Sequence, residues 1–253
     1  MFAVKKVSVL ILTAVLILTA TSLALGQGVL KVATEAGFMP FEYVDAETGA
    51  LLGFDMDLIR EIGNVLGLEV QIDNIAWDGL IPALLNGNYD CLIAGITITP
   101  ERQEAVDFSD PYFESVLTVV AKTGSGISNL DDLAGKIVAV QINTTGDFAA
   151  SDLFDAGDVK GVSRFDTVAD AMQAVIIGAA DAVVIDLPVA EAYLEANPTG
   201  ALKHSGPVSD NEFYGIAVNK NNKELLGQIN SALATLKAQG IYDAIYQKWF
   251  GGM

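Results

Sequence analysis

Strand-like and helix-like segments alternate along this 253-residue chain in two series. The first series spans residues 29–122, and the second begins after the pattern breaks at Gly124-Ser125-Gly126. Strands that are interleaved with helices favour parallel sheets with helices on both faces. Two such series in a chain of this length predict an α/β protein with two lobes.

The expected elements follow from apolar spacing and from residues that start or stop a helix. In residues 54–66 the apolar positions recur at helical spacing, and Gly67 ends the pattern. Thr167 is placed as a helix N-cap, and Gly178 ends that helix. We expect strands at 29–34, 70–75, 91–96, 115–122, 137–142, 182–187 and 213–218. We expect helices at 54–66, 78–85, 130–133, 147–154, 167–177, 188–196, 223–239 and 241–250.

Residues 1–26 have the pattern of a secretory signal peptide. Two lysines precede an apolar run at 7–20, and Ala24 and Gly26 suit the cleavage-site positions, so the mature chain would start near Gln27. A retained membrane anchor is the alternative, but the run is shorter than the roughly 20 apolar residues that a spanning helix needs. We therefore expect a protein exported to the periplasm or another extracytoplasmic location.

Charge and cysteine content narrow the possible partners. The formal net charge is −18 at pH 7, and it becomes −20 when the two lysines of the predicted signal peptide are removed. So acidic a chain is a poor partner for nucleic acid or for an anionic membrane. The single cysteine, Cys91, lies in an apolar run, and we interpret it as a buried free thiol rather than a nucleophile. Its distance from the cleavage site excludes a lipid-anchor (lipobox) cysteine.

Residues 90–112 carry the clearest signs of a binding site. An apolar run is followed by Thr97 and Thr99, and then by Pro100 and Arg102. Thr99 at an N-cap with Pro100 at the first helical position is a strong helix-start signal. A guanidinium beside the free N–H groups of a helix N-terminus suits a carboxylate. The segment therefore predicts a site for a small anion.

Five further segments place polar or aromatic residues beside strand ends or helix starts. They contain Glu35 with Phe38, Asp55 with Asp57, Trp77, residues 141–146, and Asp186. Asp55 and Asp57 lie near the positive end of a helix, so we interpret them as helix-terminal charges. Residues 141–146 lead from a strand into a helix and supply a second set of free N–H groups.

Eight motifs occur in a fixed order along the chain. They are ATEAGFMPFEY, GFDMDL, WDGLIPAL, YDCLIAGITITPER, DFSDPYF, INTTG, ADAVVIDLP and IYDAIYQKWF. This order resembles that of the extracytoplasmic solute-binding proteins of polar amino-acid ABC transporters, the glutamine, arginine and histidine type of solute-binding protein family 3. Each motif alone is weak evidence, but the ordered set covers residues 27–250.

The resemblance implies a two-lobed periplasmic binding protein fold of type II, in which each lobe is a sheet flanked by helices. Lobe 1 would comprise residues 27–113 and 214–253, and lobe 2 would comprise 114–213. Two hinge crossings would fall at 112–116 and 210–214. A ligand would bind in the cleft as the lobes close.

The resemblance also implies how an amino acid would be held at its two charged ends. Arg102 would pair with the α-carboxylate, assisted by the backbone N–H groups of Thr97 and Thr145. Asp186 would hold the α-ammonium, together with the carbonyl of Gly95 and the hydroxyl of Thr97. A closed cleft desolvates both charges, so each needs a partner.

Three residues would contact the side chain of the ligand. Phe38 and Trp77 would enclose its aliphatic part or stack on a flat amide or guanidinium, and Glu35 would read its tip. Thr144 would also contact the ligand, but its loop has Asn143 where the family commonly has glycine. Asparagine tolerates the left-handed backbone conformation, so we expect the loop to keep its shape.

Each of these residues also has a plainer interpretation. Asp186 could be a helix cap. Phe38 and Trp77 could be core aromatics, and Glu35 could be a surface acid. His204 is the only histidine and lies outside any metal-ligand pattern, so we expect no metal. We expect no cofactor either, because the dinucleotide-binding and phosphate-binding glycine motifs are missing.

Together these features predict a binding protein that captures a polar L-amino acid by hinge closure and delivers it to an ABC transporter permease. Glu35 between two aromatic rings favours arginine or another basic amino acid, with glutamine next. A cyclohexadienyl dehydratase on the same fold is the enzyme alternative, with Asp186 or Glu35 as its general acid. The sensor domain of a receptor is a further alternative. We favour a free-standing, monomeric binding protein without enzymatic activity.

Overall fold

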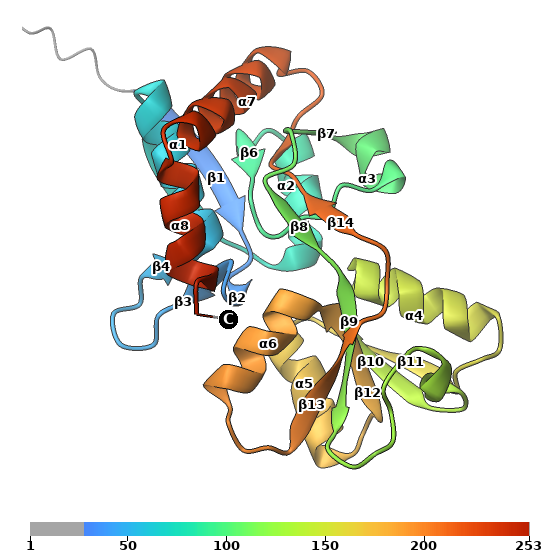
Figure 1. The fold of residues 1–253 in the computed structure, drawn as a ribbon. Coiled ribbons are helices and arrows are strands. Elements are labelled where there is room, and N and C mark those ends of the chain that lie inside the picture. Colours follow the sequence, from blue (N-terminus) through green and yellow to red (C-terminus); the bar gives the residue numbers. More distant parts are fainter. Residues whose placement is uncertain (1–27, 253) are drawn as a thin grey trace, which may run out of the picture.

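The computed structural model describes residues 28–252, so the predicted signal peptide lies outside the described residues. Two five-stranded sheets form the centres of two lobes, and helices cover their faces (Figure 1). We call the parts built on these sheets lobe 1 and lobe 2. Within residues 28–252, none of the helices combines the length and the apolar character that a membrane crossing requires.

The sheet of lobe 1 has the strand order β5-β1-β6-β15-β7. Strand β1 pairs in parallel with β5 and β6, whereas β15 runs antiparallel to β6 and β7. The strands are β1 (Val29–Thr34), β5 (Glu69–Asn74), β6 (Cys91–Leu92), β7 (Asp107–Phe108) and β15 (Ala217–Val218). A smaller sheet consists of β2 (Gly37–Phe38), β3 (Glu42–Val44) and β4 (Leu51–Leu52).

The helices of lobe 1 come from both ends of the described chain. Helices α7 and α8 pack against α1, as Figure 1 shows. The C-terminal helices are therefore part of the same lobe as β1. The helices are α1 (Phe54–Leu66), the 3-10 helix η1 (Trp77–Gly79), α2 (Leu80–Leu85), α3 (Pro100–Ala105), α7 (Lys223–Ala238) and α8 (Ile241–Phe250).

The sheet of lobe 2 has the strand order β11-β10-β12-β9-β13. Strand β10 is parallel to β11 and β12, and β9 is antiparallel to β12 and β13. The strands are β9 (Leu117–Lys122), β10 (Ile137–Gln141), β11 (Gly161–Phe165), β12 (Ala182–Asp186) and β13 (Leu202–Pro207). The helices are η2 (Asp131–Leu133), α4 (Thr145–Asp155), α5 (Val168–Ile177) and α6 (Leu187–Ala196).

Two short strands connect the lobes. Strand β8 (Phe113–Ser115) leads into β9, and β14 (Glu212–Tyr214) follows β13 and returns to lobe 1. They pair antiparallel with each other, so the two crossings lie side by side (Figure 1). We call this two-stranded sheet the crossing ribbon.

Several strand predictions from the sequence were wrong. Of the strand expected at 91–96, only Cys91–Leu92 pairs in the sheet. The strand expected at 213–218 is divided, because residues 212–214 pair in the crossing ribbon whereas residues 217–218 pair in the lobe 1 sheet. Each sheet is also mixed rather than parallel, since strands next to a crossing run antiparallel to their neighbours.

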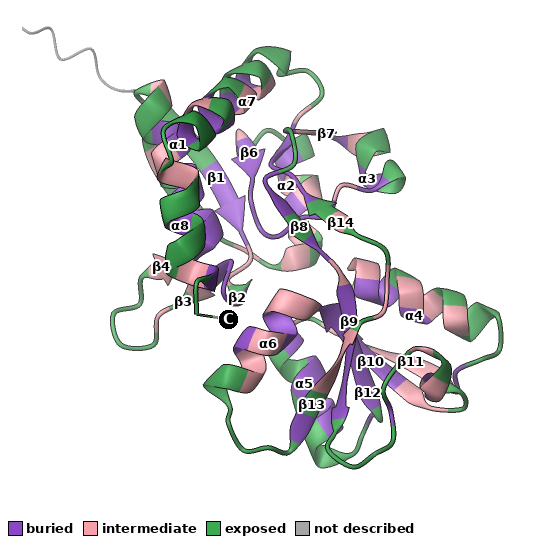
Figure 2. Ribbon diagram, viewed as in Figure 1, coloured by how far each residue is buried: buried purple, intermediate pink, exposed green. Residues whose placement is uncertain are grey.

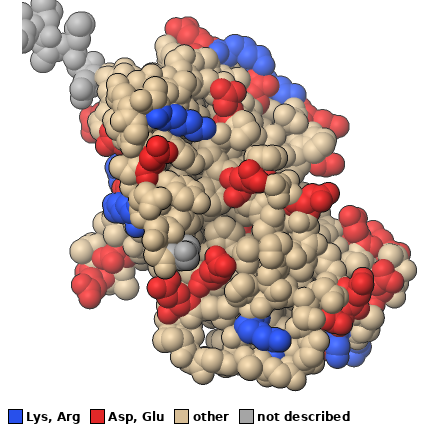
Figure 3. All heavy atoms as spheres, in the orientation of Figure 1, with Lys and Arg blue, Asp and Glu red and all other residues tan. Residues whose placement is uncertain are grey.

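Burial follows the two sheets (Figure 2). The inner strands, such as β1 and β12, are largely buried, whereas edge strands such as β5 and β11 are half-buried or exposed, and the helices are buried on one face. Cys91 is a buried free thiol, as predicted, and burial raises its pKa above the ordinary value. On the face drawn in Figure 3, acidic side chains are scattered over both lobes and basic ones are fewer. This distribution agrees with the excess of acidic residues in the sequence.

Candidate ligand-binding site

The nine residues that the family resemblance implied line one cavity between the lobes. The cavity has an empty volume of about 300 Å³, and Ala94 and Gln141 complete its lining. The nine residues are Glu35, Phe38, Trp77, Gly95, Thr97, Arg102, Thr144, Thr145 and Asp186. The sequence therefore identified residues that lie together in space, while their contacts with a ligand stay a prediction.

Strand ends explain why residues so distant in sequence meet here. In lobe 1, Glu35 follows β1 and Gly95 follows β6; in lobe 2, Gln141 ends β10 and Asp186 ends β12. Neighbouring parallel strands end at the same edge of a sheet, and this is the edge where open α/β sheets bind ligands. Both lobes turn that edge toward the shared cavity.

Arg102 is held in place by its own short helix and by both lobes. The Thr99 hydroxyl caps α3 by accepting from the Arg102 backbone N–H at 3.2 Å. The guanidinium is buried; Nη1 donates to the Thr97 carbonyl at 2.8 Å and Nη2 to the Asn143 carbonyl at 3.0 Å. A guanidinium has five N–H donors, so three remain for an anion. Burial lowers the pKa of Arg102, and the negative charge of Asp186 opposes this lowering.

The start of α4 lines the cavity from lobe 2. The Thr144 hydroxyl caps the helix by accepting from the Asp147 N–H at 3.2 Å, and it donates to the Gln141 carbonyl at 2.8 Å. Thr145 is the first helical residue, so its backbone N–H has no acceptor within the helix. Asn143 has a φ of 58°, which confirms the expected left-handed conformation. The loop thus offers N–H groups to an anion, although the Thr144 hydroxyl is already engaged.

The helix-cap interpretation of Asp186 is wrong. Asp186 precedes α6, but its side chain makes no capping hydrogen bond. Its Oδ1 instead accepts from the hydroxyls of Ser115, at 3.0 Å, and Tyr214, both on the crossing ribbon. These bonds leave Oδ2 available to a ligand. Burial raises the pKa of Asp186 to about 6 and the charge of Glu212 adds to this, while the two hydroxyl donors oppose it.

Aromatic side chains form the lobe 1 wall. Phe38 belongs to the hydrophobic core and also lines the cavity, so both interpretations of this residue describe its position. The ring centre of Trp77 lies 5.4 Å from the guanidinium carbon of Arg102. Gly95 has a φ of 54°, and a Cβ atom there would lie 2.8 Å from the Phe38 ring. The close approach of this backbone to Phe38 therefore requires glycine.

Glu35 is partly buried rather than a surface acid. Its Oε2 accepts a hydrogen bond from Nε2 of Gln141 across the cavity, at 3.4 Å. Burial raises the pKa of Glu35, and the hydrogen bond from Gln141 opposes this. The sequence analysis included Gln141 in the segment 141–146 but gave it no role in the site, although its place at the end of an expected strand was a usable signal.

Asp55 lies in the first turn of α1, as predicted, but its side chain also supports the backbone of the site. It is buried, and its Oδ2 accepts from the Gly95 N–H at 2.9 Å and from the Tyr112 hydroxyl at 2.7 Å. Burial raises the pKa of Asp55 to about 6. The neighbouring Glu42 is also buried, and burial together with the charge of Asp55 raises the pKa of Glu42 well above its ordinary value. The hydrogen bond from the Gly95 N–H to Asp55 thus ties this buried acid to the backbone of the site.

Glu212 is a second acid that the sequence analysis missed. It lies on the crossing ribbon and accepts from a threonine hydroxyl of each lobe: Thr97 at 3.1 Å and Thr145 at 2.8 Å. Glu212 and Thr97 are 115 positions apart in the chain, so no local pattern could connect them.

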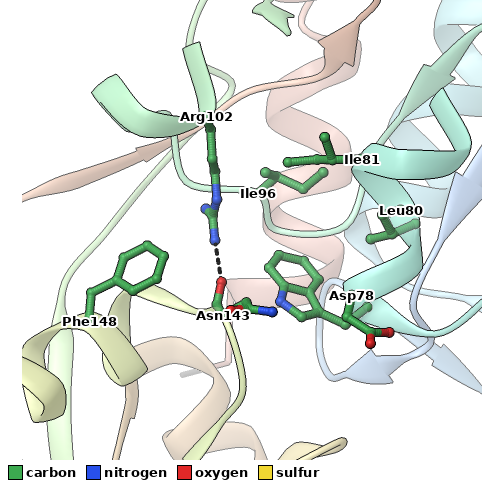
Figure 4. A pocket seen from close by; sticks show the side chains of 8 residues that line it. Asp78, Leu80, Ile81, Ile96, Arg102, Asn143 and Phe148 are labelled. Atoms are coloured by element: carbon green, nitrogen blue, oxygen red, sulfur yellow. Dashed lines mark hydrogen bonds between the residues drawn. The ribbon is translucent and has the colours of Figure 1, made fainter. Parts of the chain in front are cut away.

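A larger, more open cavity adjoins the first. Its empty volume is about 650 Å³, and Trp77 and Arg102 line both cavities. Figure 4 shows Arg102 reaching the Asn143 carbonyl, with Phe148 on one side. The guanidinium of Arg102 therefore lies at the boundary between the two spaces.

Metal ligands are not grouped in this part of the molecule. Within residues 28–252, no three or more His, Cys, Asp or Glu side chains are arranged to hold a metal ion. Arg102 and the start of α4 instead offer N–H donors, whereas Asp186 and Glu35 offer acceptor oxygens. Such an arrangement suits an organic ligand that carries both charges.

Comparison with known proteins agrees with this geometry. Residues 30–252 match the family model of the bacterial extracellular solute-binding proteins, family 3. The "Probable histidine-binding protein" of Neisseria gonorrhoeae is 37% identical over 224 residues, which cover 88% of this chain and 83% of that protein. The "ABC transporter arginine-binding protein 1" of Escherichia coli (strain K12) is 35% identical over 219 residues, covering 85% of this chain and 88% of that protein.

A solved structure supports the same relationship at the level of the fold. It is described as an ancestral arginine-binding protein bound to arginine, and it superposes with a TM-score of 0.85 at 46% sequence identity. The superposition covers 88% of this chain and 99% of that one. The two-lobed architecture is thus shared with an amino-acid-binding protein.

Proposed function

Because the chain belongs to family 3 of the bacterial extracellular solute-binding proteins, we propose that it captures a polar L-amino acid and delivers it to an ABC importer. We propose arginine or another basic amino acid as the ligand, with glutamine next. The observation that carries this proposal is that Arg102 and Asp186 line the same cavity. Each of the two side chains has hydrogen-bonding capacity left for a ligand.

These two residues match the two ends of a zwitterion. The α-carboxylate pairs with the free N–H groups of Arg102 and with the backbone N–H groups of Thr97 and Thr145. The α-ammonium binds Oδ2 of Asp186, the Gly95 carbonyl and the Thr97 hydroxyl. A zwitterion would be costly to desolvate in so small a cavity without both partners. The site therefore suits free α-amino acids better than simple anions or cations.

Local charge supports a basic side chain. Glu35 and Asp186 both line the cavity, and Arg102 is the one cation among the lining residues. An added positive charge on the ligand would be attracted by Glu35 and would lower the raised pKa of that carboxyl group. Phe38 and Trp77 offer flat surfaces on which a guanidinium can stack. Glutamine is the second choice, because a carboxylate also accepts from an amide.

Closure of the lobes is the proposed mechanism of capture. We propose lobe boundaries at residues 27–113 with 214–253, and at 114–213, with the crossing ribbon as the hinge. A ligand that touches both lobes only when they are closed shifts the population toward closure. The closed, monomeric protein would then dock on its permease. We propose that residues 1–26 direct export to the periplasm or an equivalent extracytoplasmic space.

A thermal-shift screen over the twenty amino acids tests the proposal. Ligands that bind the folded state raise the melting temperature by mass action. We expect arginine to give the largest increase, with lysine, ornithine and glutamine behind it. If no amino acid raised the melting temperature, the proposed function would be wrong, and failure of all the basic amino acids would refute the preference alone.

Dehydration of prephenate or arogenate is the enzymatic alternative. Asp186 and Glu35 are carboxyl groups with raised pKa values in the cavity, as a general acid requires. Both are accounted for by recognition of the ammonium group and of the ligand side chain, so we favour binding without turnover. Release of phenylpyruvate or phenylalanine from these substrates by the purified protein would reverse that choice.

A further inference from the structure

Glu212 joins the two lobes through the hydroxyls of two site residues. One carboxylate oxygen, Oε2, accepts from Thr97 of lobe 1 at 3.1 Å and from Thr145 of lobe 2 at 2.8 Å. Both threonines line the cavity, whereas Glu212 lies behind them on the crossing ribbon. Glu212 thus contacts residues that would touch the ligand without lining the cavity itself.

The chemistry of these groups fixes the direction of both hydrogen bonds. An ionised carboxylate only accepts, and a threonine hydroxyl has one proton to give. When that proton goes to Glu212, the hydroxyl oxygen can offer only its lone pairs to the cavity. Both hydroxyls therefore act as acceptors toward a ligand. They can accept a hydrogen bond from an ammonium group, but they cannot donate one to a carboxylate.

Two other hydrogen bonds cross the cavity, and unlike the bonds to Glu212 they engage groups that would contact the ligand. Arg102 reaches the Asn143 carbonyl at 3.0 Å, and Glu35 accepts from Gln141 at 3.4 Å. Those bonds use groups that the proposed ligand also needs. The bonds to Glu212 instead use only the hydroxyl protons, so the backbone N–H groups of Thr97 and Thr145 stay available to the ligand carboxylate.

The charge of Glu212 acts in the same direction. It stabilises the guanidinium of Arg102 and disfavours ionisation of Asp186, so it is felt at both ends of the proposed ligand site. A ligand ammonium beside Asp186 would relieve the repulsion between the two acids. The fixed hydroxyl direction and the charge therefore favour the same ligand group.

We propose that Glu212 is a positioning residue that makes the site selective for ligands with an α-ammonium group. It acts by holding the Thr97 hydroxyl as an acceptor toward that group, with Thr145 as its second anchor. This inference rests on the proposed function, because it assigns the orientation in which the amino acid lies in the cavity.

Two ligands that differ only at the α-carbon test the proposal. L-arginine and 5-guanidinopentanoic acid share the carboxylate and the guanidinium, but only L-arginine has the ammonium. Both hydroxyls donate to the same oxygen of Glu212, so the variant Glu212→Leu, which has no acceptor, frees both hydroxyl protons to face the cavity. By calorimetry we expect the Kd for L-arginine to rise about tenfold, the effect of about one charge-assisted hydrogen bond. The Kd for 5-guanidinopentanoic acid should change by less than about twofold.

A double-mutant cycle separates hydrogen-bond direction from charge alone. Thr97→Val removes the hydroxyl, so adding Glu212→Leu to it should weaken L-arginine binding much less than Glu212→Leu does in the wild type. The matched control is Glu114→Leu, which removes an exposed acid from the partner strand of the ribbon and should leave both Kd values unchanged. Melting temperatures of all variants show whether folding is affected.

Each outcome of these titrations decides the question. Equal losses for the two ligands, or fully additive effects of Thr97→Val and Glu212→Leu, would overturn the role of Glu212. If the wild type prefers glutamine, the same cycle is run with L-glutamine and glutaramic acid. A wild type that binds no amino acid would instead refute the proposed function, and the role of Glu212 with it.

Discussion

Lobe 1 lines the cavity with six of the nine predicted residues, whereas lobe 2 contributes three. The lobe 1 set contains two aromatic rings, the guanidinium and the acid that would read the ligand side chain. The lobe 2 set consists of one helix start and one strand end, at Thr144, Thr145 and Asp186. In the proposed binding mode, lobe 1 holds the groups that would distinguish one amino acid from another, together with Arg102, which would pair with the carboxylate. Lobe 2 would add contacts only to the ammonium and the carboxylate, which all amino acids share.

This difference suggests an order of events. An amino acid that meets an open cleft would find Arg102, Phe38 and Trp77 together on lobe 1. Asp186 and the start of α4 would add their contacts only on closure. The first contacts of the ligand with lobe 1 and the contacts that lobe 2 adds on closure would then be separate steps. Substitution of Arg102 in lobe 1 and of Asp186 in lobe 2, one at a time, should distinguish their contributions to affinity.

Loss of the lobe 1 anchor should have the largest effect. Arg102→Ala leaves the ligand carboxylate desolvated with fewer donors, and we expect the Kd for L-arginine to rise about 1,000-fold or beyond detection. Calorimetry measures the loss, and circular dichroism checks the fold. Arg60→Ala, at an exposed arginine of α1, is the matched control and should bind normally. Near-native affinity in Arg102→Ala would contradict the assignment.

Loss of the lobe 2 anchor should weaken binding less, because lobe 1 contacts persist. For Asp186→Asn we expect the Kd for L-arginine to rise about 100-fold. Asp181→Asn, at the other end of β12, should bind as the wild type does. An affinity loss in Asp186→Asn larger than that in Arg102→Ala would reverse the proposed order of the two lobes.

Asp186→Asn should also change stability without ligand. Burial raises the folded pKa of Asp186 to about 6, above its unfolded value of about 3.9, so its ionisation destabilises the fold as pH rises between these values. The uncharged variant should exceed the wild type in unfolding free energy by about 3 kcal/mol at pH 7.5 and by only about half a kcal/mol near pH 4. Urea titrations at both pH values measure this, and a variant that is less stable at pH 7.5 would contradict it.

The smallest effect is expected from Asp55, which accepts a hydrogen bond from the Gly95 backbone of the site. Asp55→Asn keeps an oxygen for the Gly95 N–H, but removes the charge that fixes this backbone. We expect the Kd for L-arginine to rise about threefold, the loss of part of one hydrogen bond. The matched control is Asp57→Asn, which should leave the Kd unchanged. Asp57 lies on the same helix but accepts hydrogen bonds from Lys248 and Trp249. Equal Kd values in the two variants would separate Asp55 from the site.

Much of the fold was predictable because long elements carry periodic signals. Helices such as Phe54–Leu66 and Val168–Ile177 have clear apolar spacing and glycine stops. Strands β2, β4 and β7 have only two residues each, which is too short for any periodicity to appear. The antiparallel strands beside the crossings depend on where the chain re-enters a sheet, and local sequence does not encode that.

The site shows the same division between local and distant information. Arg102 and Asp186 lie in motifs that continue from a strand end, so the pattern around each residue indicates its position. Glu212 and Tyr214 reach the site from the crossing ribbon, far from their partners in sequence. The burial of Asp55 was not predicted, because an acid at a helix start looks alike in sequence whether it is buried or exposed.

The central claim is that one cavity holds both charged ends of an amino acid. It is tested most directly by calorimetry of the wild-type protein with L-arginine and with L-argininamide, which lacks only the carboxylate. We expect one-to-one binding of L-arginine and at least about 100-fold weaker binding of the amide, because the amide gives Arg102 no anion. Similar affinities for the two ligands would contradict the claim.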